Sequence, residues 1–563
     1  MEILNIENLS FTYPDCKESA LTDISLKIKQ GDFFVICGES GCGKTTLLKL
    51  LKKELAPKGD FKGVIKYDGI PLYELDNRIS ASEIGFIMQN PEMQIVTDKV
   101  WHELAFGLEN TGAETASIRR RVAEMASFFG ISGWFRKKTS DLSGGQMQLL
   151  NLASIMVMQP KILILDEPTS QLDPIAAADF IAAIKKVNAE LETAVILVEH
   201  RLEEVFPIAD KVVVLDKGRL ILCDTPRAVG KGLKSIGKNH PMLLGLPSSI
   251  RIFNMLDIYD ECPITIKEGR HFLTKHFPEN EKTLSITRVE NAGNPVIEVK
   301  EAWFRYEKSL PDVLRGTDFS VDEGEAFGIL GGNGTGKTTI LSVISGQRKA
   351  YRGDIIINGK RIEKYKNTEL YRNNIAYLPQ NPQTVFLKST VSEDYNEIIK
   401  AMNYQKAEGA ALVLDISEKL EISQLLDRHP YDLSGGEQQK AALGKVLLLK
   451  PKILLLDEPT KGIDAYSKKK FGDIIKSLKK QGLTIVMVTH DVEFAAENTD
   501  RCAMLFDGEI VSQGIPETFF SDNNFYTTAA SRISRHMYTN TVTCQSVARL
   551  CEINTLACKK AGI

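Results

Sequence analysis

The sequence predicts an α/β fold in two copies of one domain, because three motifs return in the same order: GESGCGKTT as GGNGTGKTT, DLSGGQ as DLSGGE, and ILILDEPTS as ILLLDEPTK. The offset between copies is nearly constant, 337 − 44 = 293 for Lys44 and Lys337 and 457 − 166 = 291 for Asp166 and Asp457. In each copy an apolar run rich in strand-forming residues leads into the glycine-rich motif, and a segment with helical periodicity follows it. A period this long indicates two complete folding units and excludes a solenoid of short repeats.

The repeat divides the chain of 563 residues, which is too long for one domain, into four parts. We expect the first copy at residues 1–237 and the second at residues 295–521. Residues 238–294 carry several prolines and are predicted to form a connector with some local structure, long enough to let the two copies face each other. Residues 522–563 form a short C-terminal tail.

The composition is that of an ordinary globular protein and narrows the range of partners. Lysine and arginine number 70 against 73 aspartates and glutamates, a net charge of −3, so without a basic patch no nucleic-acid binding is expected. The first residues, MEILNIENLS, lack the features of a signal peptide, so we expect none, and the longest charge-free run, residues 142–160, is too polar to span a membrane. The nine cysteines form no CxxC pair, so we expect a reduced, cytosolic chain with neither zinc ribbon nor disulfide framework.

The two glycine-rich motifs have the form and the strand–loop–helix context of phosphate-binding P-loops. Backbone N–H groups of such a loop and the helix N-terminus attract anions. The motif lysines are expected to reach the β- and γ-phosphates, and the threonines that follow them to place a hydroxyl on Mg²⁺. The predicted phosphate-binding residues are Gly38, Gly41, Gly43, Lys44, Thr45 and Thr46 in the first copy and Gly331, Gly334, Gly336, Lys337, Thr338 and Thr339 in the second.

Each copy also has an Asp-Glu pair after a continuous apolar run, ILIL or ILLL, which is typical of a parallel strand buried on both faces. Ligands of open α/β sheets bind at the carboxyl ends of such strands. Asp166 and Asp457 therefore suit Mg²⁺ coordination, and Glu167 and Glu458 suit activation of the attacking water. The alternative is that these acids only cap a following turn.

A histidine ends a further apolar run in each copy, His200 after AVILVE and His490 after TIVMVT. The two histidines lie at matching distances from the acids, 200 − 166 = 34 and 490 − 457 = 33 residues. We interpret both as contacts to a γ-phosphate, although a single histidine after a strand is more often an ordinary surface residue.

The motifs LSGGQ and LSGGE each open a predicted helix, with Ser143 and Ser434 as N-caps. They are either plain helix starts with flexible glycines or a second phosphate site, because a helix N-terminus binds anions. The P-loop already holds the nucleotide of its own copy. A second phosphate site is therefore useful only if it closes over the nucleotide of the other copy, which predicts a sandwich of the two.

Together these motifs resemble the ATP-binding cassette (ABC) family, whose signature LSGGQ lies between a P-loop and an acid pair. The resemblance covers both copies and implies, for each, a parallel-sheet core, an antiparallel β subdomain and a helical signature subdomain. It also implies that Lys44 and Ser434 enclose one ATP, and Lys337 and Ser143 the other. The nucleotide-binding signature residues that it implies are Ser143, Gly144, Gly145, Gln146, Ser434, Gly435, Gly436 and Glu437.

The resemblance assigns further residues. Tyr13 and Tyr306, each 31 residues before its P-loop lysine (44 − 13 and 337 − 306), would stack on adenine; otherwise they are ordinary strand aromatics. Gln89 and Gln380 match the Q-loop glutamine, which senses the nucleotide and its Mg²⁺ and borders the surface that meets a membrane partner. The D-loop aspartates, which act across the interface, would be Asp173 and Asp464.

Both copies keep the lysine, the acid pair and the histidine, so two competent hydrolysis sites are expected. The departures from the family pattern are small. Glu437 replaces the usual glutamine, and the stretch KGI before Asp464 is an unusual lead-in to the D-loop. At most, these departures make the two ATP sites unequal in activity.

Within the family, the segment QNPEMQIVTDKVWHELAFGLEN is similar to the one that follows the Q-loop in ATPases of energy-coupling factor (ECF) transporters, and QNPQTVFLKSTVSEDY is a shorter match. ECF systems import vitamins, their precursors, or nickel and cobalt ions. The likeness implies two ATPase subunits fused in one chain, at the cytoplasmic face of the membrane. The implied partners are a transmembrane T-type subunit and a substrate-binding membrane subunit.

Two other functions are compatible with twin cassettes. One is a soluble ATPase that acts on ribosomes or nucleic acid; such proteins tend to carry charged helical linkers, basic tails or zinc modules, whereas this connector has mixed charge and prolines. The other is the ATPase of a sugar or nucleoside importer, in which one site is often degraded, whereas both sites here are complete.

The tail holds one unexplained pattern. Cys544, Cys551 and Cys558 repeat every seven residues beside Val547 and Leu550, so a helix would place the thiols on one stripe. A buried packing surface is the favoured interpretation, and metal or redox chemistry is the alternative.

Overall fold

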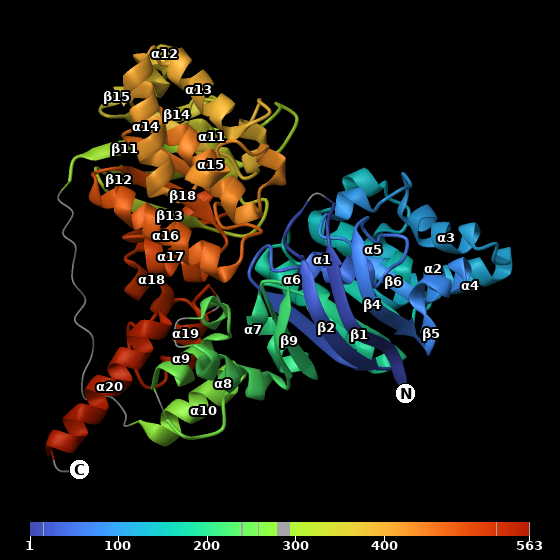
Figure 1. The fold of residues 1–563 in the computed structure, drawn as a ribbon. Coiled ribbons are helices and arrows are strands. Elements are labelled where there is room, and N and C mark those ends of the chain that lie inside the picture. Colours follow the sequence, from blue (N-terminus) through green and yellow to red (C-terminus); the bar gives the residue numbers. More distant parts are fainter. Residues whose placement is uncertain (15, 238–239, 257, 278–292, 525, 562–563) are drawn as a thin grey trace. The chain divides into compact units, whose positions relative to one another are not determined.

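The computed structural model describes residues 1–14, 16–237, 240–256, 258–277, 293–524 and 526–561. The chain forms two compact units, the first comprising Met1–Asn254 and Tyr259–Thr265, the second Met255–Ile258 and Ile266–Ile563. Each unit has its own pair of sheets with helices around them (Figure 1). In the described part of the chain, no helix is long and apolar enough to cross a membrane.

The first unit contains an antiparallel sheet and a mainly parallel one. The antiparallel sheet has the order β2-β1-β4-β5. Its strands are β1 (Glu2–Thr12), β2 (Leu21–Lys29), β4 (Asp60–Tyr67) and β5 (Ile70–Pro71). The second sheet has the order β10-β9-β3-β8-β7-β6, parallel except for the β9–β10 pair. Its strands are β3 (Phe33–Gly38), β6 (Ile84–Ile87), β7 (Ile162–Asp166), β8 (Ala194–Val198), β9 (Lys211–Asp216) and β10 (Arg219–Asp224).

The helices of the first unit include those that begin at the loops carrying the motifs. They are α1 (Lys44–Leu50), α2 (Asn77–Glu83), α3 (Val100–Asn110), α4 (Thr115–Phe128), α5 (Gly144–Met156), α6 (Pro174–Leu191), α7 (Leu202–Val205), α8 (Pro226–Ile236) and α9 (Ser248–Leu256). Helix α3 packs against both α4 and α5. These three helices form the helical subdomain that carries the signature motif.

The second unit repeats the arrangement. Its antiparallel sheet has the order β12-β11-β14-β15, and its mainly parallel sheet the order β16-β17-β18-β13-β19-β20, which matches β6-β7-β8-β3-β9-β10 of the first unit. The strands are β11 (Pro295–Phe304), β12 (Leu314–Asp322), β13 (Ala326–Leu330), β14 (Arg352–Ile357), β15 (Lys360–Arg361), β16 (Ile375–Leu378), β17 (Ile453–Asp457), β18 (Thr484–Thr489), β19 (Arg501–Phe506) and β20 (Glu509–Gly514). The predicted α/β fold in two copies is confirmed.

The helices of the second unit include additional ones at both of its ends. They are α10 (Ile266–His276), α11 (Lys337–Ile344), α12 (Asn367–Tyr371), α13 (Val391–Ala401), α14 (Lys406–Lys419), α15 (Gly435–Leu447), α16 (Ala465–Lys480), α17 (Val492–Asn498), α18 (Pro516–Asp522), α19 (Ala529–Ser534) and α20 (Cys544–Ala561). Helices α10, α19 and α20 lie outside the pattern shared by the two units.

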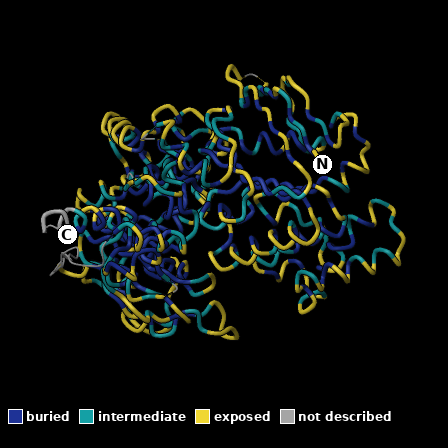
Figure 2. The backbone as a smooth tube through the Cα atoms, turned by 90° about the horizontal axis from the view of Figure 1, so that it is seen from below, coloured by how far each residue is buried: buried dark blue, intermediate teal, exposed yellow. Residues whose placement is uncertain are grey.

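The main core of each unit joins its two sheets and the P-loop helix. In the first unit Ile6 and Ile24 of the antiparallel sheet, Phe34 and Ile196 of the parallel sheet and Leu47 of α1 belong to one buried cluster. Continuous apolar strands such as β7 and β8 are buried along their whole length, because the parallel sheet is covered on both faces. Buried residues accordingly lie in the interior of each unit (Figure 2).

The described part of the expected connector is divided between the two units. Helix α9 packs on α8 of the first unit, where the Asn254 side chain donates to the Gly230 carbonyl at 3.0 Å. Helix α10 belongs to the second unit and packs on α19, where the Arg270 guanidinium donates to the Arg532 carbonyl at 2.6 Å. Residues 278–292 of the connector lie outside the described residues.

The cysteine stripe of the tail falls on α20. Cys544 and Cys551 are buried, as are Val547 and Leu550, and burial raises the pKa of Cys551 to about 12. The Cys558 side chain lies outside the described residues. The burial of Cys544 and Cys551 fits the packing interpretation.

Candidate active sites

The P-loops follow the first parallel strand of each unit. Strand β3 ends at Gly38 and α1 begins at Lys44; β13 ends at Leu330 and α11 begins at Lys337. The residue before each helix, Gly43 or Gly336, has a φ of 101° or 102°. A Cβ at Gly43 would lie 2.6 Å from the Ala20 carbonyl oxygen, so this junction requires glycine for both backbone conformation and space.

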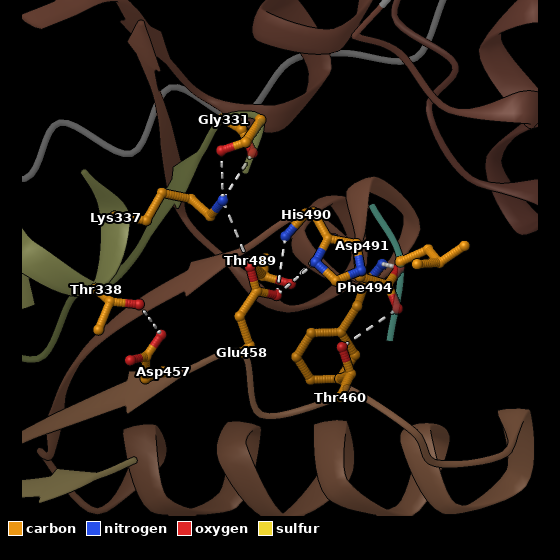
Figure 3. A network of polar contacts seen from close by, with 12 residues as sticks. Gly331, Lys337, Thr338, Asp457, Glu458, Thr460, Thr489, His490, Asp491 and Phe494 are labelled. Carbon is orange, nitrogen blue, oxygen red and sulfur yellow. Dashed lines mark hydrogen bonds and ion pairs between the residues drawn. The ribbon is translucent and has the colours of Figure 1, made fainter. Parts of the chain in front are cut away.

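Both P-loop lysines are buried and hydrogen-bonded within their own loops. The Lys44 ammonium donates to the carbonyls of Gly38 and Glu39 at 3.0 and 2.8 Å. The Lys337 ammonium donates to those of Gly331 and Gly332, both at 2.9 Å (Figure 3). The positive charges thus lie inside the loops that are expected to receive the phosphates.

The threonine after each lysine contacts the first acid of the pair. The hydroxyl of Thr45 donates to Asp166 Oδ1, and that of Thr338 to Asp457 Oδ1, each at 3.1 Å. Burial, together with the neighbouring Glu167 charge, raises the pKa of Asp166 to about 6, and burial also raises the pKa of Asp457. The threonine hydroxyl and the aspartate carboxylate are hard oxygen donors of the kind that Mg²⁺ prefers, so these residues fit that ion.

The second acid of each pair contacts the histidine. His200 Nε2 lies 2.8 Å from Glu167 Oε1, and His490 Nδ1 lies 2.8 Å from Glu458 Oε2. The Lys337 ammonium lies 3.6 Å from Glu458 Oε1 (Figure 3). Burial opposes ionisation of Glu458, but the hydrogen bonds and charge of His490 and the charge of Lys337 outweigh it and lower the pKa of Glu458. Glu458 is therefore held as a carboxylate.

The two glutamates also share an unusual backbone conformation. The φ of Glu167 is 47° and that of Glu458 is 45°, the left-handed region that residues with a Cβ seldom adopt. Strain of this kind persists only where the surrounding structure imposes it, and it is common at functional sites.

The Q-loop glutamines have different surroundings in the two units. Gln89 Nε2 donates to Glu167 Oε2 at 2.9 Å, which connects the Q-loop to the acid pair. Gln380 is exposed, as Gln89 is, but its side chain forms no hydrogen bond within the described part of the chain. A direct contact between the Q-loop glutamine and the acid pair is thus present in the first unit.

The signature serines begin helices, as expected, and both form capping boxes. In the first unit the Gln146 N–H donates to Ser143 Oγ at 3.3 Å, and the Ser143 N–H donates to Gln146 Oε1 at 3.1 Å. In the second unit both the N–H and the hydroxyl of Ser434 donate to Glu437 Oε2, at 2.9 and 2.8 Å. Glu437, which stands where the first copy has Gln146, therefore keeps the capping box and in addition accepts a hydrogen bond from the Ser434 hydroxyl.

The tyrosines that were expected to meet adenine lie next to the P-loop helices. The hydroxyl of Tyr13 is 3.0 Å from that of Thr46, and the hydroxyl of Tyr306 is 3.0 Å from that of Thr339. The Arg348 guanidinium lies 4.6 Å from the Tyr306 ring centroid. Each aromatic ring is therefore held beside its nucleotide loop.

The D-loop aspartates act as helix caps within their own units. Asp173 Oδ1 accepts the N–H groups of Ile175 and Ala176 at the start of α6. Asp464 accepts the N–H and the hydroxyl of Ser467 at the start of α16. Their role across an interface stays a prediction.

Several residues at these sites were missed from sequence. Tyr377 donates to Asp457 Oδ2 at 2.9 Å. Asp491, after His490, accepts a hydrogen bond from the Lys468 ammonium at 2.6 Å. Glu199 and Thr489 precede the two histidines and are buried. Alignment of VEHR with VTHD would have revealed the last pair, because the two copies differ on both sides of the shared histidine.

The two P-loops, the acid pairs at strand ends and the capped LSGG helices define an ATPase of the cassette class. The ABC transporter family matches residues 21–170 and 314–461. A protein of Bacillus thuringiensis subsp. konkukian, named as a candidate ABC transporter ATP-binding protein, is 42% identical over 546 residues, 97% of this chain and 98% of that protein. The chain therefore belongs to the ABC transporter family and is an ATP hydrolase with two cassettes.

Other relatives are more distant. A protein of Methanosarcina acetivorans, with the same description, is 31% identical over 534 residues, 92% of this chain and 86% of that protein. Among solved structures, cbiO1 from Clostridium perfringens, described as part of the ABC transporter complex cbiONQ, is 27% identical. That alignment covers 41% of this chain and 92% of the other, with a TM-score of 0.38.

Proposed function

We propose that the chain is the energy-coupling ATPase of an importer of the ECF type and that it acts on a separate transmembrane partner. The observation that supports a partner is a short segment after Gln89 with exposed apolar side chains. Met93, Val96 and Trp101 are 78%, 66% and 41% exposed, and Leu387 in the matching segment of the second unit is 78% exposed. Large exposed apolar side chains that cluster in this way are typical of interaction surfaces.

The same segment carries the ECF resemblance, QNPEMQIVTDKVWHELAFGLEN. We therefore assign the partners as a T-type transmembrane subunit and a substrate-binding membrane subunit, with this chain bound at the cytoplasmic face of the membrane. The substrate would be a vitamin, a vitamin precursor, or cobalt or nickel. Its identity would be determined by the membrane subunit, because specificity resides there in the ECF arrangement.

We assign the two cassettes to residues 1–237 and 295–521 and propose that they pair head to tail. One ATP would lie between Lys44 and Ser434, and the other between Lys337 and Ser143. The support is that α5 and α15 begin at a capped serine followed by two glycines, and such a helix start offers free N–H groups to a phosphate.

Each site contains groups for the separate tasks of hydrolysis. In the first unit Thr45, Asp166 and Gln89 would hold Mg²⁺, which when bound neutralises charge on the β- and γ-phosphate oxygens. Glu167 would accept a proton from the attacking water, and His200 would contact the γ-phosphate and keep Glu167 oriented. The counterparts in the second unit are Thr338, Asp457, Gln380, Glu458 and His490.

ATP binding would draw the cassettes together, and hydrolysis with product release would let them part. A shift from 1:99 to 99:1 requires about 5.5 kcal/mol of differential binding. Two nucleotides, each bridging a P-loop and the N-terminus of a signature helix, are a reasonable source for it. The segment after each Q-loop would transmit the motion to the partner.

The partner assignment can be tested by affinity purification of the chain from detergent-solubilised membranes of its own host. We expect multi-spanning membrane proteins to co-purify with the wild-type chain and with Val511→Glu, a matched change at an exposed position of β20. Met93→Glu with Val96→Glu should lose them, because two carboxylates oppose apolar docking. Fluorescent-nucleotide binding checks that this variant remains folded.

Two outcomes would contradict the assignment. Recovery with ribosomes or nucleic acid in place of membrane proteins would support the soluble twin-cassette alternative. Recovery with a sugar or nucleoside permease would support the other importer class.

A further inference from the structure

The residue before the catalytic histidine differs between the two units. Glu199 follows β8 in the first unit, and Thr489 ends β18 in the second. Both side chains are buried, with 2% of Glu199 and 0% of Thr489 exposed. Acidic side chains are seldom buried to this degree unless their oxygens are used, and burial raises the pKa of Glu199.

The difference changes which group receives the histidine backbone N–H. In the first unit Glu199 Oε1 accepts the N–H of His200 at 3.1 Å and that of Arg201 at 3.3 Å. In the second unit the His490 N–H donates to Glu458 Oε2 at 3.1 Å, and Thr489 Oγ1 accepts the N–H of Asp491 at 3.0 Å. Glu199 thus takes a hydrogen bond that, in the second unit, the proposed catalytic glutamate receives.

The consequence appears at the two catalytic glutamates. Glu458 Oε2 is bound by both the N–H and the Nδ1 of His490, so the histidine loop holds this oxygen at two points (Figure 3). Glu167 is bound by His200 Nε2 through Oε1 and by Gln89 Nε2 through Oε2. The first unit therefore links its glutamate to both the histidine loop and the Q-loop.

We propose that Glu199 is a positioning residue: it accepts the His200 backbone N–H, and the histidine loop then leaves the Glu167 carboxylate oriented with Oε2 toward Gln89. The first ATP site is then coupled to the Q-loop, next to the proposed partner surface, whereas the second site holds its glutamate independently of Gln380. The functional part of this inference, the coupling of the first ATP site to the Q-loop, rests on the proposed roles of Glu167 and Gln89 in hydrolysis. The geometric part, the effect of Glu199 on the contact between Gln89 and Glu167, does not depend on those roles.

The geometric part is tested by a crystal structure of the full-length Glu199→Thr variant without nucleotide. Threonine occupies this position in the second unit. Its shorter side chain can accept a hydrogen bond from the Arg201 N–H, as Thr489 Oγ1 accepts one from the Asp491 N–H. We expect the His200 N–H to donate to Glu167 Oε2 and Gln89 to leave the glutamate. Unchanged contacts of Gln89 and His200 with Glu167 would overturn the inference without affecting the proposed function.

The functional part is tested by a double-mutant cycle of Glu199→Thr and Gln89→Ala, with ATP turnover read in a Glu458→Gln background that silences the second site. Each change should lower kcat at least about tenfold, as expected for one lost hydrogen bond to a charged group, with little change in KM. The double variant should be no slower than the slower single variant, because both break the same link.

Two controls separate positioning from a general structural role. Glu199→Gln keeps the acceptor oxygen and should restore most of the turnover. Thr489→Val and Gln380→Ala, measured by ATP turnover in a Glu167→Gln background, should act independently. The double variant should therefore lower kcat by the product of the two single effects. Multiplying effects for Glu199→Thr and Gln89→Ala would contradict the coupling, whereas full turnover of a Glu167→Gln, Glu458→Gln chain would instead contradict the catalytic assignment.

Discussion

At the scale of single residues, the two sites share a framework and differ in what surrounds the proposed Mg²⁺ carboxylates. Asp166 and Asp457 each accept a threonine hydroxyl at 3.1 Å. Asp457 also accepts the Tyr377 hydroxyl at 2.9 Å, whereas Phe86 occupies the matching position on β6 and has no hydroxyl to give. The carboxylate of the second unit is therefore fixed by an additional hydrogen bond.

Removal of this hydroxyl should weaken metal binding at the second site. In a Glu167→Gln background, we expect Tyr377→Phe to raise the Mg²⁺ concentration for half-maximal turnover about tenfold, because groups that orient a ligand typically contribute at least this much to affinity. Binding of Mn²⁺ with a non-hydrolysable ATP analogue, followed by electron paramagnetic resonance, measures the effect without turnover.

The first unit provides the reciprocal control. Phe86→Tyr, read in a Glu458→Gln background, should shift the metal requirement of the first site in the opposite direction. If Tyr377→Phe left Mn²⁺ binding unchanged, the hydroxyl would not orient Asp457.

At the scale of elements, a buried ion pair ties the helical subdomain of the second unit to the segment after its Q-loop. Lys445 on α15 lies 2.6 Å from Asp394 on α13, and the side chains are 9% and 0% exposed. Asp394 also accepts the N–H groups of Leu387 and Lys388. The first unit makes the same connection with Glu103 on α3, which accepts two N–H groups from residues 96 and 97.

Loss of the cation from this pair should be costly. Lys445→Met leaves the Asp394 carboxylate buried without its counter-ion, so we expect a loss of about 3–5 kcal/mol in the free energy of local unfolding. Hydrogen exchange of α13 and α15 in the full-length chain measures it.

A matched control is Lys419→Met, which removes an exposed partner of Asp415 on α14. This change should alter the free energy of unfolding by less than about 1 kcal/mol, because exposed ion pairs contribute little. Similar protection factors for the two variants would show that the Lys445 pair adds no stability.

At the scale of the whole molecule, each unit contains a complete P-loop, acid pair, histidine and signature helix. The first unit is extended by α9, and the second by α10, α19 and α20. The expected connector is therefore partly structure that belongs to one unit or the other. Two complete cassettes in one chain fix their ratio at one to one. The proposed cycle, in which both cassettes bind ATP and pair, requires this ratio.

Loss of both proposed catalytic glutamates should stop the proposed cycle after ATP binding. We expect Glu167→Gln with Glu458→Gln to lower ATP turnover at least about 100-fold, the usual contribution of a general base, and to retain two ATP molecules per chain. Turnover and equilibrium dialysis measure the two effects. The exposed changes Glu190→Gln and Glu509→Gln serve as the control; unchanged turnover in the double catalytic variant would refute the assignment.

Much of the site could be predicted from the sequence because its parts depend on local backbone conformation. The P-loop before Lys44 and the capped helix after Ser143 are set by glycine and serine at fixed spacing, and the acid pair follows directly from a buried strand. The repeat then revealed the second copy of each. Local contacts of this kind require no knowledge of how distant segments pack.

The tertiary structure decided the contacts between distant segments. Gln89 and Glu167 are 78 residues apart and meet through a hydrogen bond, while Glu199 accepts the His200 N–H beside them; that the first contact depends on the second is our proposal. The division of the connector and the burial of Cys544 depend in the same way on packing. The sequence by itself determined which reactive groups each cassette carries, because these groups lie in short motifs with local backbone conformations. Only the tertiary structure determined which distant groups hydrogen-bond to them, because those partners come from separate segments that packing brings together.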